Sequence, residues 1–93
     1  MTTLKLTDCV KRQDRLLTSR IDNEEVMLDM DSGSYFGLNV IGSEIWQRLA
    51  KPITVADLCQ QLQTEYEISK EQCETEVLGF LHEMLAGNLI QTV

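Results

Sequence analysis

Residue types that could carry out catalysis or hold a metal are few in this chain, and their spacing suits neither task. The three cysteines, Cys9, Cys59 and Cys73, form no CxxC pair, and with a single histidine, His82, they cannot provide zinc-ligand spacing. We interpret them as reduced, partly buried thiols. No serine lies in a nucleophile-elbow pattern, and His82 is expected on the solvent side of a helix, without the partner that a catalytic base needs. The sequence therefore predicts no enzyme, with no catalytic residue, no metal site and no cofactor.

The composition limits both the size of the fold and its partners. A chain of 93 residues, 43% of them hydrophobic, can build one modest core, so we expect a single domain over residues 1–93. The N-terminus lacks the apolar region of a signal peptide, and no apolar run approaches the roughly 20 residues of a membrane span. These features favour a cytoplasmic protein with no membrane partner. A net charge of −7 would be repelled by phosphate groups, so no nucleic-acid partner is expected.

Three short segments with alternating polarity predict a sheet in the first half of the chain. They lie at 15–21, 26–30 and 35–38 and are separated by turn residues, among which Gly33 can supply a positive φ. The simplest arrangement is an antiparallel meander. Everything after the third segment reads as helix, so the third strand is predicted to be an edge of the sheet. Residues 1–14 show only weak periodicity.

Three helices are expected to follow the sheet. Asn39 is a good N-cap for a helix over about 40–50, and Thr54 and Ser69 begin the capping signals of two more. Gly87-Asn88 is a C-cap signal for the last helix, after which Leu89 and Ile90 are expected to fold back onto the core. The order of elements predicts an α+β fold of the winged helix-turn-helix type, with a three-stranded antiparallel sheet followed by three helices.

The third helix carries an apolar arc that is wider than burial on one side requires. Its central stripe is formed by Cys73, Val77, Phe80 and Met84. Leu81 and Leu85 flank this stripe, and Gly79 adds a position without a side chain. An edge strand beside such a helix is typical of a groove that captures an extended peptide by strand addition. Ordinary core packing is the alternative interpretation of the stripe.

A winged-helix regulator, or a structural protein-interaction domain, is the alternative function for this fold. A DNA-recognition helix needs basic or amide side chains in its first turns. The third helix has one lysine, Lys70, among Glu71, Glu74 and Glu76. This charge pattern favours a peptide partner over DNA.

The ordered set of residues from 15 to 90 resembles the PqqD-like proteins, also called RiPP recognition elements. Residues of the hairpin and the following helix carry the resemblance: Leu28, Asp29, Gly33, Tyr35, Phe36, Leu38, Asn39, Gly42, Ile45 and Trp46. The Thr54-Val55 helix start, the Tyr66 to Ser69 junction and Gly87-Asn88-Leu89 agree with it. The resemblance implies a non-catalytic protein that binds the leader segment of a ribosomally made precursor peptide and delivers it to a modifying enzyme.

The resemblance also implies where the leader would bind. It would add as a strand beside the third strand, against the third helix. The pairing edge would be Ser34, Tyr35, Phe36, Gly37 and Leu38, and the groove wall would be Cys73, Glu76, Val77, Phe80 and Met84. The size of the chain looks most like the stand-alone proteins of lasso-peptide biosynthesis, whose partner is a leader peptidase. A radical-SAM peptide-modifying enzyme is the alternative client, and a weak homodimer is a further association left open.

Overall fold

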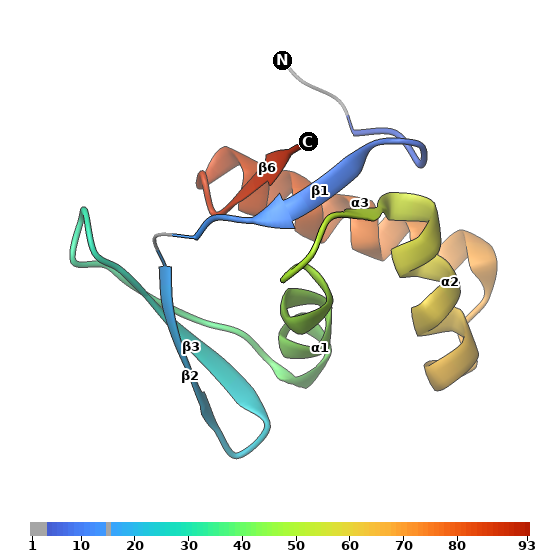
Figure 1. The fold of residues 1–93 in the computed structure, drawn as a ribbon. Helices are drawn as coiled ribbons and strands as arrows, with labels where there is room; N and C mark the ends of the chain where they lie inside the picture. Colours follow the sequence, from blue (N-terminus) through green and yellow to red (C-terminus); the bar gives the residue numbers. More distant parts are fainter. Residues whose placement is uncertain (1–3, 15) are drawn as a thin grey trace.

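The computed structural model describes residues 4–14 and 16–93, in which two small sheets flank three helices (Figure 1). The elements in chain order are β1 (Cys9–Arg12), β2 (Leu16–Ile21), β3 (Glu24–Asp29), β4 (Tyr35–Gly37), α1 (Val40–Arg48), β5 (Ile53–Thr54), α2 (Val55–Tyr66), α3 (Lys70–Ala86) and β6 (Ile90–Thr92). The α+β class and the meander before the helices are confirmed.

The first sheet is the predicted meander, with strand order β2-β3-β4. Its first turn places Asp22 and Asn23 at positive φ, which suits the twist of a tight hairpin. The second turn uses Gly33 at φ +74°, as the sequence indicated. Register pairs Met27 with Phe36, so these two side chains lie on the same side of the sheet. β4 is the end strand, and the prediction of a sheet edge there is confirmed.

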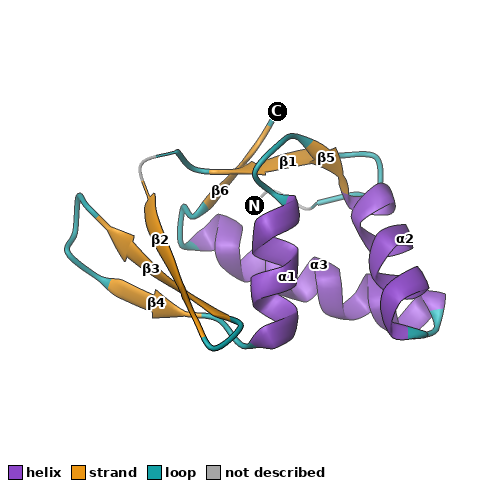
Figure 2. Ribbon diagram, turned by 60° about the horizontal axis from the view of Figure 1, so that its bottom comes forward, coloured by secondary structure: helices purple, strands orange, loops and turns teal. Residues whose placement is uncertain are grey.

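A second sheet, in the order β5-β1-β6, was not predicted. The expectation that everything after β4 is helical is wrong, because β5 and β6 both pair with β1. Figure 2 shows this sheet lying across the ends of the helices, away from the β2-β3-β4 sheet. β5 has two residues and β6 has three, too few to show an alternating pattern, so their pairing depends on tertiary contacts.

The three helices begin where the capping residues indicated. Asn39 Oδ1 accepts from the Gly42 N–H at 2.8 Å, Thr54 Oγ1 from Asp57 at 3.1 Å, and Ser69 Oγ from Gln72 at 3.2 Å. Each bond satisfies an amide that the first helical turn leaves free. After α3 it is Asn88, at φ 59°, that takes the left-handed conformation.

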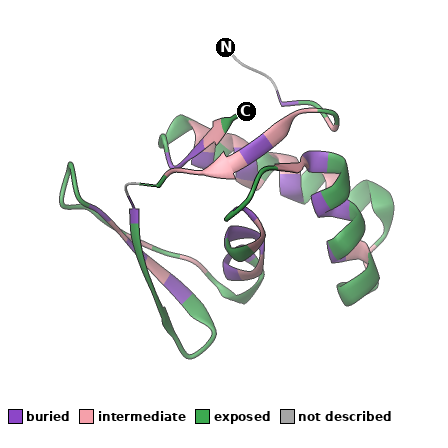
Figure 3. Ribbon diagram, viewed as in Figure 1, coloured by how far each residue is buried: buried purple, intermediate pink, exposed green. Residues whose placement is uncertain are grey.

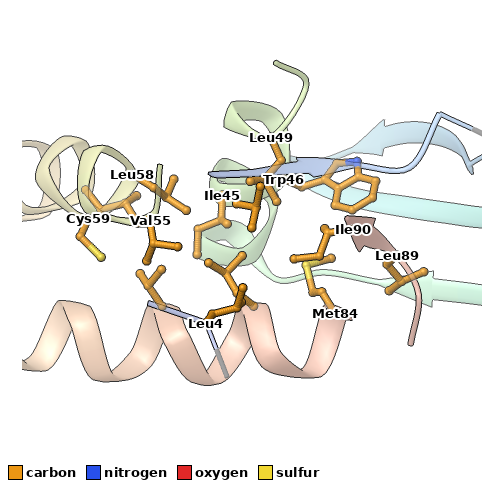
Figure 4. Packing of buried hydrophobic residues seen from close by; sticks show 14 of the residues in the cluster. Leu4, Ile45, Trp46, Leu49, Val55, Leu58, Cys59, Met84, Leu89 and Ile90 are labelled. Carbon is orange, nitrogen blue, oxygen red and sulfur yellow. The ribbon is translucent and has the colours of Figure 1, made fainter. Parts of the chain in front are cut away.

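The core lies between α1, α2, α3 and the β1 sheet, and it is centred on α1. Figure 4 shows Ile45, Trp46 and Leu49 of α1 pointing into this space, with Met84 and Ile90 on its other side. Burial is concentrated on the facing sides of the helices, whereas the far end of the β2-β3 hairpin is exposed (Figure 3). Removal of these apolar side chains from water is the main stabilising contribution.

The N-terminal segment forms hydrogen bonds with the end of α1, with α3 and with the residue that precedes β6. The N–H of Arg12 donates to the Leu49 carbonyl and that of Gln13 to the Leu89 carbonyl, each at 2.9 Å. Leu4 is buried, and its N–H donates to Nε2 of His82 at 3.1 Å. His82 is therefore only partly exposed, and its ring has a hydrogen-bond partner in the N-terminal segment that the sequence did not reveal.

Candidate functional site

The free edge of β4 offers two residues for pairing. Leu38 N–H donates to the Glu25 carbonyl and Asp29 N–H to the Ser34 carbonyl, each at 2.9 Å. Hydrogen-bonded and non-bonded residues alternate along an antiparallel pair, so the intervening Tyr35 and Gly37 direct their N–H and C=O groups away from β3. Among residues 4–14 and 16–93, no strand pairs with that side of β4.

A groove of about 480 Å³ lies between this edge, the start of α1 and the side of α3. Most of its lining is apolar, with contributions from all three helices. The lining residues are Gly37, Leu38, Asn39, Ile41, Gly42, Ile45, Leu62, Tyr66, Ile68, Cys73, Glu76, Val77, Phe80 and Glu83. An open apolar groove beside free backbone groups suits a ligand that brings both a backbone and apolar side chains.

A shallower depression of about 410 Å³ continues toward the end of α3. Its lining is Met27, Tyr35, Phe36, Gly37, Leu38, Phe80, Glu83, Met84, Gly87 and Leu89. Gly37, Leu38, Phe80 and Glu83 line both hollows. The two hollows therefore form one groove that follows β4, which we call the β4/α3 groove.

The structure brings together nine of the ten residues expected at the site. Only Ser34 lines neither hollow, although its carbonyl fixes the register of β4. The remaining nine are Tyr35, Phe36, Gly37, Leu38, Cys73, Glu76, Val77, Phe80 and Met84.

Glycine 79 does not belong to the groove. It is exposed and lines neither hollow, and a Cβ placed on it would meet no atom within 4 Å. Gly42 occupies the position that Gly79 was expected to fill: a Cβ there would lie 3.4 Å from Cε1 of Phe80. The sequence carried no sign of this, because it depends on how α1 packs against α3.

The apolar stripe of α3 is divided between the core and the groove. Cys73, Val77 and Met84 are buried, as is Leu81, which was expected to flank the stripe. Phe80, expected at its centre, is only partly buried and faces the groove. The partly buried Phe80 agrees with a stripe that is wider than the core needs, whereas Leu81, expected beside the stripe, belongs to the core.

Further lining residues were not anticipated. Ile41 and Ile45 come from α1, Tyr66 from the end of α2, Ile68 from the loop after it, and Glu83 from α3. Glu83 lies seven residues after Glu76, two helical turns, and this spacing could have identified it as a neighbour on the same face.

The junction between β4 and α1 is held by the buried hydroxyl of Ser43. Its Oγ accepts from Glu25 N–H at 2.7 Å and donates to the Leu38 carbonyl at 3.3 Å. A hydroxyl that is fully used in this way fixes the strand relative to the helix. Ser43 therefore positions the edge strand beside the groove without lining it.

Two buried thiols join α2 and α3 beside the groove, which Cys73 also lines. Cys73 Sγ lies 3.6 Å from the Cys59 carbonyl oxygen, to which it donates. Burial raises the pKa of the Cys59 thiol from 9.0 to about 12, and burial also raises the pKa of Cys73. Both groups are protonated near neutral pH and are poor nucleophiles.

The charges on the groove wall have one sign. Glu76 and Glu83 are its charged residues, and neither hollow is lined by a lysine or arginine among the described residues. Glu76 Oε1 lies 3.4 Å from Nε2 of Gln72.

Within residues 4–14 and 16–93, no group of three His, Cys, Asp or Glu side chains could hold a metal ion.

The other face of the β2-β3-β4 sheet carries a second exposed apolar surface. Register aligns Leu17 with Leu28 and Leu28 with Tyr35 across the three strands. Leu17 is 57% exposed and Tyr35 74% exposed. A contiguous apolar row of this kind marks a surface that can contact another protein.

No helix in the described part of the chain has the length and apolar character needed to cross a membrane.

Comparisons with known proteins agree with this geometry. A family model described as "Coenzyme PQQ synthesis protein D (PqqD)" matches residues 24–90, well over half of the chain. Comparison with curated proteins gave no match.

Two solved structures have a similar fold. "TbiB1 in Complex with the TbiA(beta) Leader Peptide" has a TM-score of 0.79 and 29% identity, over 87% of this chain and 94% of that one. "Lasso peptide synthetase B1 complexed with the leader peptide" has a TM-score of 0.78 and 26% identity, over 88% of this chain and 96% of that one.

Proposed function

Because this chain belongs to the PqqD family, we propose that it binds the leader segment of a ribosomally made precursor peptide and presents it to a processing enzyme. The leader adds to the sheet as a strand beside β4, in the β4/α3 groove. The observation that carries this proposal is the free edge at Tyr35 and Gly37, which borders an open apolar groove.

Strand addition would use both the free backbone edge of β4 and the apolar wall of the groove. Backbone bonds to Tyr35 and Gly37 supply affinity that is independent of the leader's side chains. Alternate leader side chains then point into the groove, where Ile41, Val77 and Phe80 contribute apolar surface. Both similar solved structures are described as complexes with leader peptides, which supports the same ligand class here.

We propose that the chain has no turnover of its own. The buried, protonated thiols of Cys59 and Cys73 are unsuited to nucleophilic attack, and His82 is engaged with the Leu4 amide. Its contribution to the pathway is to hold the leader while a separate enzyme acts on the precursor.

A leader peptidase of lasso-peptide biosynthesis is the favoured client, since one similar structure is a lasso peptide synthetase B1. A radical-SAM peptide-modifying enzyme is the alternative. The apolar row of Leu17, Leu28 and Tyr35 lies on the opposite face of the sheet from the buried Met27. Leu17 and Leu28 line neither hollow of the groove, so this part of the row remains available to a client while the leader occupies the groove.

The proposal is tested by selecting ligands from a displayed library of random peptides of about 12 residues, long enough to pass both hollows at about 3.3 Å per residue. The Phe80→Glu variant serves as the control protein, because it replaces an aromatic ring of the groove wall by a carboxylate. We expect recurrent apolar peptides that bind the unmodified chain and are lost on the variant. Failure to recover any peptide that prefers the unmodified chain would overturn the proposal. We refer to the tightest binder from this library as the selected peptide.

A further inference from the structure

We propose that the β4/α3 groove is specific for leaders that carry a lysine or arginine beside their apolar residues, and that Glu76 and Glu83 recognise this cation. The inference rests on the proposed function and adds the charge of the ligand to it. Both carboxylates line the groove on α3, opposite the pairing edge of β4. A strand added to that edge at about 4.8 Å from β4 would lie between the edge and these carboxylates.

The two carboxylates are placed along the path of the ligand. Seven residues of helix separate Glu76 from Glu83, which corresponds to about 10.5 Å. Both side chains are exposed, so they lie at the solvent-facing rim above the apolar wall made by Val77 and Phe80. Lysine and arginine suit this arrangement, because their aliphatic stems cover apolar surface while the charged group stays at the rim.

Neither carboxylate is neutralised within the described part of the chain. No ion pair to Glu76 or Glu83 is found there. The cations that form ion pairs in the described residues are used elsewhere: Arg48 contacts Glu44 and Glu65, Arg20 contacts Glu44, and Lys11 contacts Asp14. Gln72, the hydrogen-bond partner of Glu76, leaves its charge unchanged. The groove therefore presents uncompensated negative charge to its ligand.

The charge of the whole chain acts in the same direction. A net charge of −7 repels an acidic segment and attracts a basic one over a distance set by ionic strength. Shape and apolar contact would hold many peptides in the groove. An acidic residue placed beside Glu76 or Glu83 would be rejected, which gives specificity through repulsion as well as attraction.

Peptides recovered from the random library provide the first measurement. We expect lysine and arginine to be enriched, and aspartate and glutamate depleted, at positions next to the apolar residues. In the selected peptide, replacement of that cation by glutamine should weaken binding by roughly 3- to 10-fold, the range of a partly exposed ion pair. Raising NaCl from about 0.05 M to about 0.5 M should have a similar effect through screening.

Variants of the protein assign the effect to the two carboxylates. Glu76→Gln combined with Glu83→Gln should reproduce the loss seen with the glutamine peptide, and should cause no further loss with that peptide. Glu71→Gln is the matched control, because Glu71 lies on the same helix and lines neither hollow of the groove. Melting curves of the variants show that the fold is intact.

The outcomes separate this inference from the proposed function. If peptides bind in the groove with no preference for basic residues, and the double variant binds them as tightly as the unmodified chain, the charge specificity is wrong while leader binding stands. If no peptide prefers the unmodified chain, both fail. If Glu71→Gln weakens binding as much as the double variant does, the effect comes from overall charge, and recognition by Glu76 and Glu83 is refuted.

Discussion

Gly42 of α1 lies against Phe80 of α3: a Cβ at position 42 would be 3.4 Å from the Cε1 atom of the phenylalanine ring. The same Cβ would be 3.2 Å from Oδ1 of Asn39, the N-cap of α1. The absence of a side chain at Gly42 therefore keeps open the part of the groove between the two helices.

Gly42→Leu should close the β4/α3 groove. The leucine side chain would occupy the space beside Phe80, so we expect affinity for the selected peptide to fall by about tenfold or more. Fluorescence anisotropy with the labelled peptide measures the change. Gly79→Leu is the matched control on an exposed helical position with open space around it, and it should bind normally. Equal binding by both variants would show that the peptide does not pass Gly42.

Val77 and Phe80 should respond differently to a buried charge, although both line the groove. Val77 is 3% exposed, so Val77→Glu places a carboxylate in the core and should destabilise the fold by several kcal/mol. Phe80 is only partly buried, so a glutamate there can reach water, and Phe80→Glu should remain folded while losing the peptide. Thermal melting and anisotropy separate the two effects. Similar melting temperatures for the two variants would contradict the division of α3 between core and groove.

The sequence predicted the elements that are long or that begin at a clear capping or turn residue. It missed the short strands β5 and β6, which depend on tertiary packing. The caps at Asn39, Thr54 and Ser69 act locally, so they were readable in advance. β5 and β6 form only because β1 lies between them, and no local pattern announces that contact.

For the candidate site, the sequence predicted the edge strand but not which residues of α3 face the groove. The free edge follows from strand order, which the turns indicate. The choice between Phe80 and Leu81 as the groove residue cannot be made from α3 alone, because both lie within its apolar arc. Only the positions of α1 and β4 decide it, and they also decide that Gly42 rather than Gly79 borders the groove.

The thiols of Cys59 and Cys73 should resist modification in the folded protein. We expect iodoacetamide to react first with Cys9, which is half-buried, and with Cys59 and Cys73 only after unfolding. Mass spectrometry of the alkylated chain shows the order. Modification of Cys73 in the folded protein at the rate of Cys9 would show that the groove exposes it.

Alkaline pH should destabilise the fold through Cys59. Its pKa is raised from 9.0 to about 12, so the folded state retains a proton that the unfolded chain releases. The stability from the neutral thiol is present below pH 9.0 and is lost as pH rises toward about 12. Urea unfolding at pH values on either side of 9.0 should show a smaller alkaline loss for Cys59→Ala than for the unmodified chain. Identical losses would assign the effect to other groups.

Proline at position 37 should separate folding from peptide binding. The Gly37 N–H points away from β3, so Gly37→Pro removes a donor for the peptide without removing a bond of the sheet. We expect a folded variant whose affinity for the selected peptide is about tenfold lower or worse. Gly37→Ala keeps the N–H and has open space around its Cβ, so it should bind normally. A folded Gly37→Pro protein with normal affinity would exclude pairing at this residue.

Amide hydrogen exchange of the unmodified chain tests strand addition at β4 most directly. With the selected peptide bound, the Tyr35 and Gly37 amides should exchange much more slowly, because they gain hydrogen-bond partners. The Leu38 amide, already bonded to Glu25, should change far less and serves as the internal reference. Slowed exchange at Tyr35 and Gly37 is the predicted result. Unchanged exchange at both amides, under saturating peptide, would contradict binding by strand addition.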